Sequence, residues 1–121
     1  MQRGKGRKKT QLEKKKDKYK DLYFSWGSVH CPALKKPVHF TRLGWNHLME
    51  IKKRTDMERK ERLEILPLAR KLISLTTTVQ GKRFQDRYQT YEFIALMDGP
   101  KIKVVISEEK GEFYFLSVFK M

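Results

Sequence analysis

Two of the chain's three histidines lie eight residues apart in the stretch HFTRLGWNHL, residues 39–48. Imidazole changes its charge near neutral pH, so it can both take and give a proton in a reaction. His47 falls one helical turn from Leu43 and Ile51, which makes it either the best acid–base candidate or a hydrogen-bonded histidine at the edge of the core. His39 alternates with apolar neighbours in a short predicted strand, so we expect it to point to the polar side as a second acid–base group.

Four basic side chains outside the N-terminal segment could bind a phosphate and stabilise charge that develops on it. They are Arg70, Arg83, Arg87 and Lys103. Each could equally be an ordinary surface charge, although Arg70 lies within the most apolar predicted helix. The hydroxyls of Thr77 and Ser117 could orient a phosphate or a water molecule, or could belong to ordinary strand residues.

Composition indicates a single basic domain whose partner is a polyanion. The chain has 121 residues with 28 Lys and Arg against 14 Asp and Glu, a net charge of +14. Such a balance first suggests nucleic acid, and no apolar run is long enough to span a membrane, so no membrane partner is predicted. Cys31 is the single cysteine, which excludes an internal disulfide and a cysteine metal cluster. We expect a cytoplasmic protein without a metal or another cofactor.

The charge is concentrated in residues 1–20, which hold ten basic and two acidic side chains. A segment so charged and so poor in apolar groups is predicted to be disordered in isolation. It is either a phosphate-seeking arm, with Lys14, Lys15 and Lys16 among its contacts, or a solubilising tail. Residues 21–121 are predicted to form one domain.

The elements that position these side chains are two helices followed by four strands. A helix is predicted over 43–54, and Thr55 and Glu58 form a capping box for a second helix that Pro67 should kink or restart. Strands are predicted over 76–85, 88–97, 101–107 and 112–120, with an Asp-Gly hairpin signal at 98–99. The expected fold is α+β, with the two N-terminal helices packed on one face of a four-stranded antiparallel sheet.

Alternation predicts which strand residues share a face of that sheet. Lys103 should lie on the face away from the helices, opposite Ile102 and Val104. In the strand over 112–120 both alternating sets are apolar, so either set could face the helices.

Five short segments together resemble the small phage-associated nucleases grouped with barnase, EndoU, colicin E5/D and RelE. These segments are VHFTRLGWNHL, LPLARKLI, TTT, DGPKIKVVI and FYFLSVF. The resemblance covers roughly residues 30–120. It implies two N-terminal helices on a four-stranded antiparallel sheet and metal-independent RNA cleavage, often by a toxin that a partner restrains. Carried over by position, it marks His47, Arg70, Thr77, Lys103 and Ser117 as site residues.

The leading hypothesis is therefore an RNA endonuclease whose targets are mRNA or tRNA, free or ribosome-bound, and whose inhibitor would be an acidic antitoxin. Cleavage by attack of the 2′-hydroxyl would leave a 2′,3′-cyclic phosphate and spare DNA. The alternatives are a non-catalytic RNA- or DNA-binding module, which would bind in a salt-sensitive way, and an interaction subunit of a larger complex whose basic surface meets an acidic protein.

Overall fold

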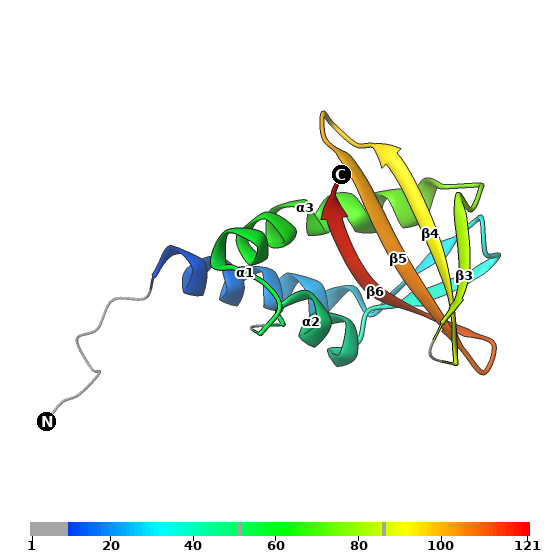
Figure 1. Cartoon of the computed structure of the whole chain (residues 1–121), viewed down its shortest axis with the longest axis horizontal. Coiled ribbons are helices and arrows are strands. Elements are labelled where there is room, and N and C mark those ends of the chain that lie inside the picture. Colours follow the sequence, from blue (N-terminus) through cyan, green and yellow to red (C-terminus); the bar gives the residue numbers. More distant parts are fainter. Residues whose placement is uncertain (1–9, 51, 86) are drawn as a thin grey trace, which may run out of the picture.

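A computed structural model of the chain describes residues 10–50, 52–85 and 87–121, and in this range three helices pack against one mixed sheet (Figure 1). The elements are α1 (Gln11–Trp26), β1 (Ser28–Cys31), β2 (Lys36–His39), α2 (Arg42–Leu48), α3 (Asp56–Leu75), β3 (Gly81–Gln85), β4 (Tyr88–Leu96), β5 (Lys101–Glu109) and β6 (Glu112–Lys120). The strand order in the sheet is β1-β2-β6-β5-β4-β3. The α+β class is confirmed, whereas the prediction of two helices and four antiparallel strands is incomplete.

The additional helix is α1, and it corrects the prediction of a disordered arm for residues 11–20. Thr10 accepts a hydrogen bond from the backbone of Glu13, whose side chain accepts one from the backbone of Thr10, so a capping box starts this helix. Residues 11–20 are therefore helical, while 1–9 lie outside the described residues. The helix is held by an apolar stripe at helical spacing, formed by Leu12, Tyr19, Tyr23 and Trp26.

The additional strands are β1 and β2, which form a hairpin at the edge of the predicted sheet. Val38 pairs with Val29 on β1 and with Phe113 on β6, and the β2–β6 pairing is parallel. Val38 and Cys31 are fully buried, so the hairpin extends the core. The sequence predicts a short strand only around 38–40, because the two prolines in this region favour a turn.

The long helix α3 begins as predicted and runs without interruption through Pro67. Thr55 and Glu58 make both hydrogen bonds of the capping box. The second half of α3 lies behind β5 and β4 in Figure 1, whereas its first half extends past the part of β6 that β2 leaves unpaired. This placement lets side chains from the first half reach round to the other face of the sheet.

A β-bulge decides which face each residue of β6 occupies. Ser107 pairs with Tyr114 and Val105 pairs with Ser117, so two residues of β5 span three of β6. Tyr114 and Ser117 therefore share one face although they are three residues apart. The alternation expected over 112–120 therefore breaks at this point.

The face that α3 covers carries the core, and the other face is polar and uncovered by any described helix in its β3–β5 part (Figure 1). The covered face presents Phe93, Ile102, Val104, Ile106, Phe115 and Val118, all fully buried. We call the second surface the open face and define it by Thr90, Glu92, Lys103, Ser107, Tyr114, Ser117 and Phe119. The prediction that Lys103 lies opposite Ile102 and Val104 is confirmed.

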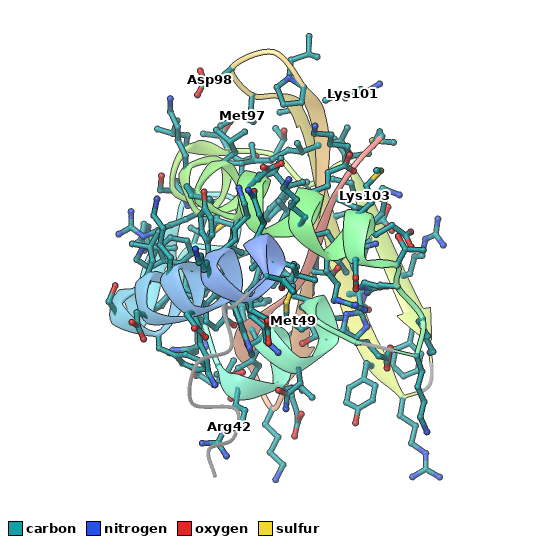
Figure 2. All side chains as sticks on the ribbon, turned by 90° about the vertical axis from the view of Figure 1, so that its left-hand side faces the viewer. Arg42, Met49, Met97, Asp98, Lys101 and Lys103 are labelled. Carbon is teal, nitrogen blue, oxygen red and sulfur yellow. The ribbon has the colours of Figure 1, made fainter. Side chains whose placement is uncertain are left out.

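The β4–β5 hairpin follows the predicted Asp-Gly signal. Asp98 and Gly99 have positive φ values of 51° and 114°, and the amide of Met97 donates to the carbonyl of Pro100 over 2.8 Å. Figure 2 shows Met97 and Asp98 around this tip, at the opposite end of the molecule from Arg42 at the start of α2. The hairpin tip is therefore remote from α2.

Helix α2 approaches β6 closely at Gly44, and this contact gives a stability prediction. A β-carbon at Gly44 would overlap the carbonyl oxygen of Phe115 and the hydroxyl of Tyr23. We expect Gly44→Ala to lower the free energy of unfolding by about 1–3 kcal/mol, as overpacking does. In urea denaturation the matched change in the same helix, Asn46→Ala at an exposed position, should cost less than about 0.5 kcal/mol. Equal stabilities of the two variants would contradict the close approach.

Candidate active site

The open face is hollowed where α2 meets the sheet. A groove of about 640 Å³ lies between α2 with its following loop and the ends of β4, β5 and β6. Its lining includes His47, Lys53, Tyr88, Ser107, Glu109 and Tyr114. The groove therefore joins one sequence-predicted histidine to side chains from three strands.

His47 occupies the last turn of α2 and is half-buried at one side of the groove. Its Nδ1 is buried and has no hydrogen-bond partner among the described residues. Burial lowers the pKa of His47, and the positive charges of Arg54, Arg62 and Lys53 lower it further against the opposing effect of Glu50. The imidazole is thus held neutral at physiological pH, which is the form that accepts a proton.

Arg62, from the first half of α3, reaches the open face beside β6. Its Nη1 donates to Ser117 Oγ over 2.8 Å, and its guanidinium carbon lies 5.2 Å from the centroid of the Phe119 ring. Burial and the charge of Arg54 lower the pKa of Arg62 against the opposing effects of Glu58 and Glu61, but a guanidinium stays charged in proteins. Among the described residues no carboxylate forms an ion pair with Arg62. A half-buried cation in this position favours an anionic ligand.

Lys103, on β5, contacts the same Phe119 ring as this arginine. Its Nζ is 5.7 Å from the centroid of the Phe119 ring and 3.6 Å from Glu92 Oε1. Arg83 Nε lies 3.3 Å from the other oxygen of the same carboxylate. Glu92 is little exposed and pairs with both cations on the open face, so it draws the Lys103 ammonium toward β4.

The structure brings together some of the predicted site residues and separates others. His47, Lys103, Ser117 and Arg83 lie around the open face, with Arg62 and Arg54 as members that the sequence did not single out. The stretch MERKERLE, which contains Arg62, has the charge pattern of a solvated helix face, so local pattern alone gives no signal for its role.

The structure places Arg70 and Thr77 away from these residues. Arg70 lies eight residues beyond Arg62, about 12 Å further along α3, where the helix has passed behind the sheet. Its guanidinium carbon lies 5.6 Å from the centroid of the Trp26 ring, and its buried Nε has no partner among the described residues. Thr77 is exposed in the loop between α3 and β3.

His39 lies next to the groove. Its Nε2 is 3.1 Å from Glu112 Oε1, and its ring centroid is 5.5 Å from that of Tyr114. Tyr114 stands between His39 and the rest of the groove, since it lines the groove and pairs with His39 across the parallel strands. His39 is therefore close enough to support the site from its β2 side.

The remaining predicted phosphate-binding residues occupy other positions. Arg87 is exposed in the turn before Tyr88 and has a φ of 72°. Lys14, Lys15 and Lys16 lie on α1, which packs on α3, and Lys15 Nζ is 2.8 Å from Glu64 Oε2. These lysines form a second basic surface that is separate from the groove.

Comparisons with known proteins found no match, so this candidate site is assigned from the chemistry and geometry of its own residues. No protein-family model matches the sequence, and no curated protein or solved structure matches it either. Within the described residues, no group of three or more His, Cys, Asp and Glu side chains is arranged to hold a metal ion, and no helix is long and apolar enough to cross a membrane.

The charge of Arg54 gives a pH prediction for the site. If neutral His47 is the base, the acid limb of kcat/KM for RNA cleavage should lie below the ordinary histidine value of about 6.5. Arg54→Gln removes a positive charge that lowers the pKa of His47, so it should move this limb to higher pH. Lys71→Gln, at a lysine paired with Asp98 instead, should leave the limb in place. An unchanged limb in Arg54→Gln would count against His47 as the titrating group.

Proposed function

We propose that this protein is a metal-independent RNA endonuclease of the barnase and RelE type. The observation that carries the proposal is the neutral, half-buried His47 in a groove beside Arg54 and Arg62, without a carboxylate paired to Arg62 among the described residues. A proton acceptor close to cations is the arrangement that transfer at a phosphodiester requires.

The reaction follows from the roles of these side chains. His47 takes the proton of a ribose 2′-hydroxyl, and the 2′-oxygen forms a bond to the adjacent phosphorus. The bond from phosphorus to the 5′-oxygen breaks, and the leaving oxygen takes a proton from water on the exposed side of the groove. Arg62 and Lys103 stabilise the negative charge on the phosphoryl oxygens, and Ser117 fixes the direction of the Arg62 guanidinium. The products are a 2′,3′-cyclic phosphate and a 5′-hydroxyl.

Single-stranded RNA, such as mRNA or a tRNA loop, is the proposed substrate. Its bases are unstacked and accessible, whereas a duplex would present only its backbone to a groove of this size. The lysines of α1 would add salt-dependent affinity for the flanking phosphates. An acidic inhibitor protein that covers the groove would make the enzyme a restrained toxin.

A second candidate function is non-catalytic RNA binding, which the separate basic surface on α1 favours. This surface has no part in the proposed chemistry and would serve a binding module equally well. The two functions differ in their outcome on RNA, because a binding module retards RNA and leaves it intact.

The test compares RNA with its 2′-deoxy counterpart. We expect the purified protein to cut a single-stranded RNA in the presence of a chelator and to leave a DNA of the same sequence intact. An RNA with 2′-O-methyl groups throughout should also resist, since the attacking hydroxyl is blocked. Intact RNA after incubation with folded protein would contradict the proposal, and so would equal cutting of RNA and DNA.

A further inference from the structure

The outer edge of β3 has no partner strand in the part of the chain that the structure describes. β3 stands at one end of the strand order and pairs with β4 alone, from Gly81 opposite Glu92 to Gln85 opposite Tyr88 (Figure 1). Alternate residues of an antiparallel strand direct their backbone N–H and C=O groups to opposite sides, so one set of these groups in β3 points away from the sheet. Such an edge can accept one more strand.

This edge strand carries a large apolar side chain that the described residues leave uncovered. Phe84 pairs with Gln89 across β3 and β4, so it lies on the same face of the sheet as Phe93. Phe93 is fully buried beneath α3, whereas Phe84 is 73% exposed. An apolar side chain placed beside Phe84 would therefore extend the buried layer past the present edge of the sheet.

The charge along this edge is positive. Residues 81–87 contain three basic side chains and one acidic side chain, which lies outside the described residues. Arg83 is already paired with Glu92. Lys82 and Arg87 are exposed, and neither forms an ion pair with another described residue. Carboxylates on a neighbouring strand would be attracted to these two cations.

A second copy of the chain fits this edge poorly. In an antiparallel pairing centred on Arg83, the arginine of one copy would stand directly opposite the arginine of the other. A shift by one residue would place Lys82 of each copy opposite Arg83 of the other copy. Like charges that face each other across two strands are destabilising, and charged edge residues are a common protection against self-pairing. The charge pattern therefore favours a different, acidic chain.

Nucleic acid has the required charge but lacks a matching backbone. The phosphate oxygens of RNA accept hydrogen bonds, so they can pair with the N–H groups of the edge but not with its C=O groups. A peptide strand presents N–H and C=O groups at the same spacing as β3, so it pairs with both. An added protein strand thus matches this edge better than a phosphate chain does.

We propose that the outer edge of β3 binds an extended acidic segment of a partner protein, which adds one more strand to the sheet. On the face of Lys82 and Phe84, this segment places a carboxylate beside the lysine and an apolar side chain beside the phenylalanine. The proposal goes beyond RNA cleavage, because neither of these side chains takes part in the proposed reaction.

Binding of a designed peptide tests this edge directly. A fluorescently labelled peptide with repeats of Glu-Glu-Val-Val places acidic and apolar side chains on both of its faces, and its dissociation constant is measured by anisotropy with the purified full chain. We expect Lys82→Glu to weaken binding about tenfold, because it replaces an attractive cross-strand pair by a repulsive one. Lys20→Glu, the same change at an exposed lysine of α1, should alter the constant less than about twofold, because distant surface charges are screened. No saturable binding, or an equal loss in both variants, overturns the proposal.

Amide hydrogen exchange separates strand pairing from attraction by charge alone. At a saturating peptide concentration, the outward amides of β3 should exchange more slowly, while the amides of α1 keep their rates. Phe84→Ser should weaken the peptide without changing the fold, since this side chain is exposed. Unchanged exchange throughout β3, or full affinity in Phe84→Ser, would contradict an added strand.

The other two occupants are outcomes of the same experiments. Self-association of the chain that Phe84→Ser abolishes would assign the edge to a second copy. Displacement of the peptide by a single-stranded RNA that itself protects the β3 amides would assign the edge to nucleic acid. Either result overturns the proposal. None of these assays involves cleavage, so their failure would leave the proposed nuclease activity untouched.

Discussion

His47→Gln should lower kcat/KM for RNA cleavage by about 10²–10⁴-fold, the contribution that a positioned acid–base group usually makes. Glutamine keeps a polar group of similar size in the half-buried position but cannot take a proton. The measurement is the initial rate of cleavage of a labelled RNA, made at equal protein concentration and with a chelator present. Thermal unfolding of the variant should stay within a few degrees of the wild type, since no hydrogen bond of Nδ1 is lost.

His30→Gln is the matched control for this change. His30 is exposed on β1 and remote from the groove, so its variant should cleave within twofold of the wild type. Purification by the same procedure also exposes contaminating nuclease, which would give equal rates in every sample. Mock preparations made without the protein should be inactive. If they are inactive and His47→Gln still cleaves RNA, His47 does not belong to the active site.

Arg62→Gln should lower kcat/KM by about 10²–10³-fold, as loss of a donor to developing charge does. The change removes the cation that donates a hydrogen bond to Ser117. It also removes a positive charge that lowers the pKa of His47, so this pKa should rise. The acid limb of the pH profile should therefore move to higher pH together with the loss of rate. A purely structural role of Arg62 would not move the limb.

Arg70→Gln separates this effect from a general loss of positive charge. Both arginines belong to α3, but Arg70 stacks on Trp26 behind the sheet. We expect Arg70→Gln to cleave within twofold of the wild type, with any cost appearing in the unfolding temperature. Greater loss of activity in Arg70→Gln than in Arg62→Gln would contradict the site described here.

Local signals in the sequence predicted the elements with strong periodicity or specific caps. The capping box of Thr55 and Glu58 fixed the start of α3, and the Asp-Gly pair fixed the β4–β5 hairpin. Helix α1 was missed because the many basic side chains of residues 1–20, five of them within α1, masked the apolar stripe that includes Tyr19 and Tyr23. That helix is held by packing on α3, a tertiary contact that composition does not reveal.

The site was predicted in part because its residues come together through long-range geometry. His47 was found from its residue type and helical position, and Lys103 from strand alternation. The sequence pattern singled out Arg70 and not Arg62, because it does not show which half of α3 passes the part of β6 that β2 leaves unpaired. The bulge that turns Tyr114 and Ser117 to one face likewise depends on pairing with β5.

Analysis of the RNA ends left by the purified protein tests the proposed chemistry most directly. Attack by a 2′-hydroxyl that His47 deprotonates must leave a 2′,3′-cyclic phosphate on one fragment and a 5′-hydroxyl on the other. We predict these ends from the wild type and their absence from His47→Gln. Fragments with a 3′-hydroxyl and a 5′-phosphate would contradict the mechanism, because a water molecule and not the ribose would then have attacked the phosphorus.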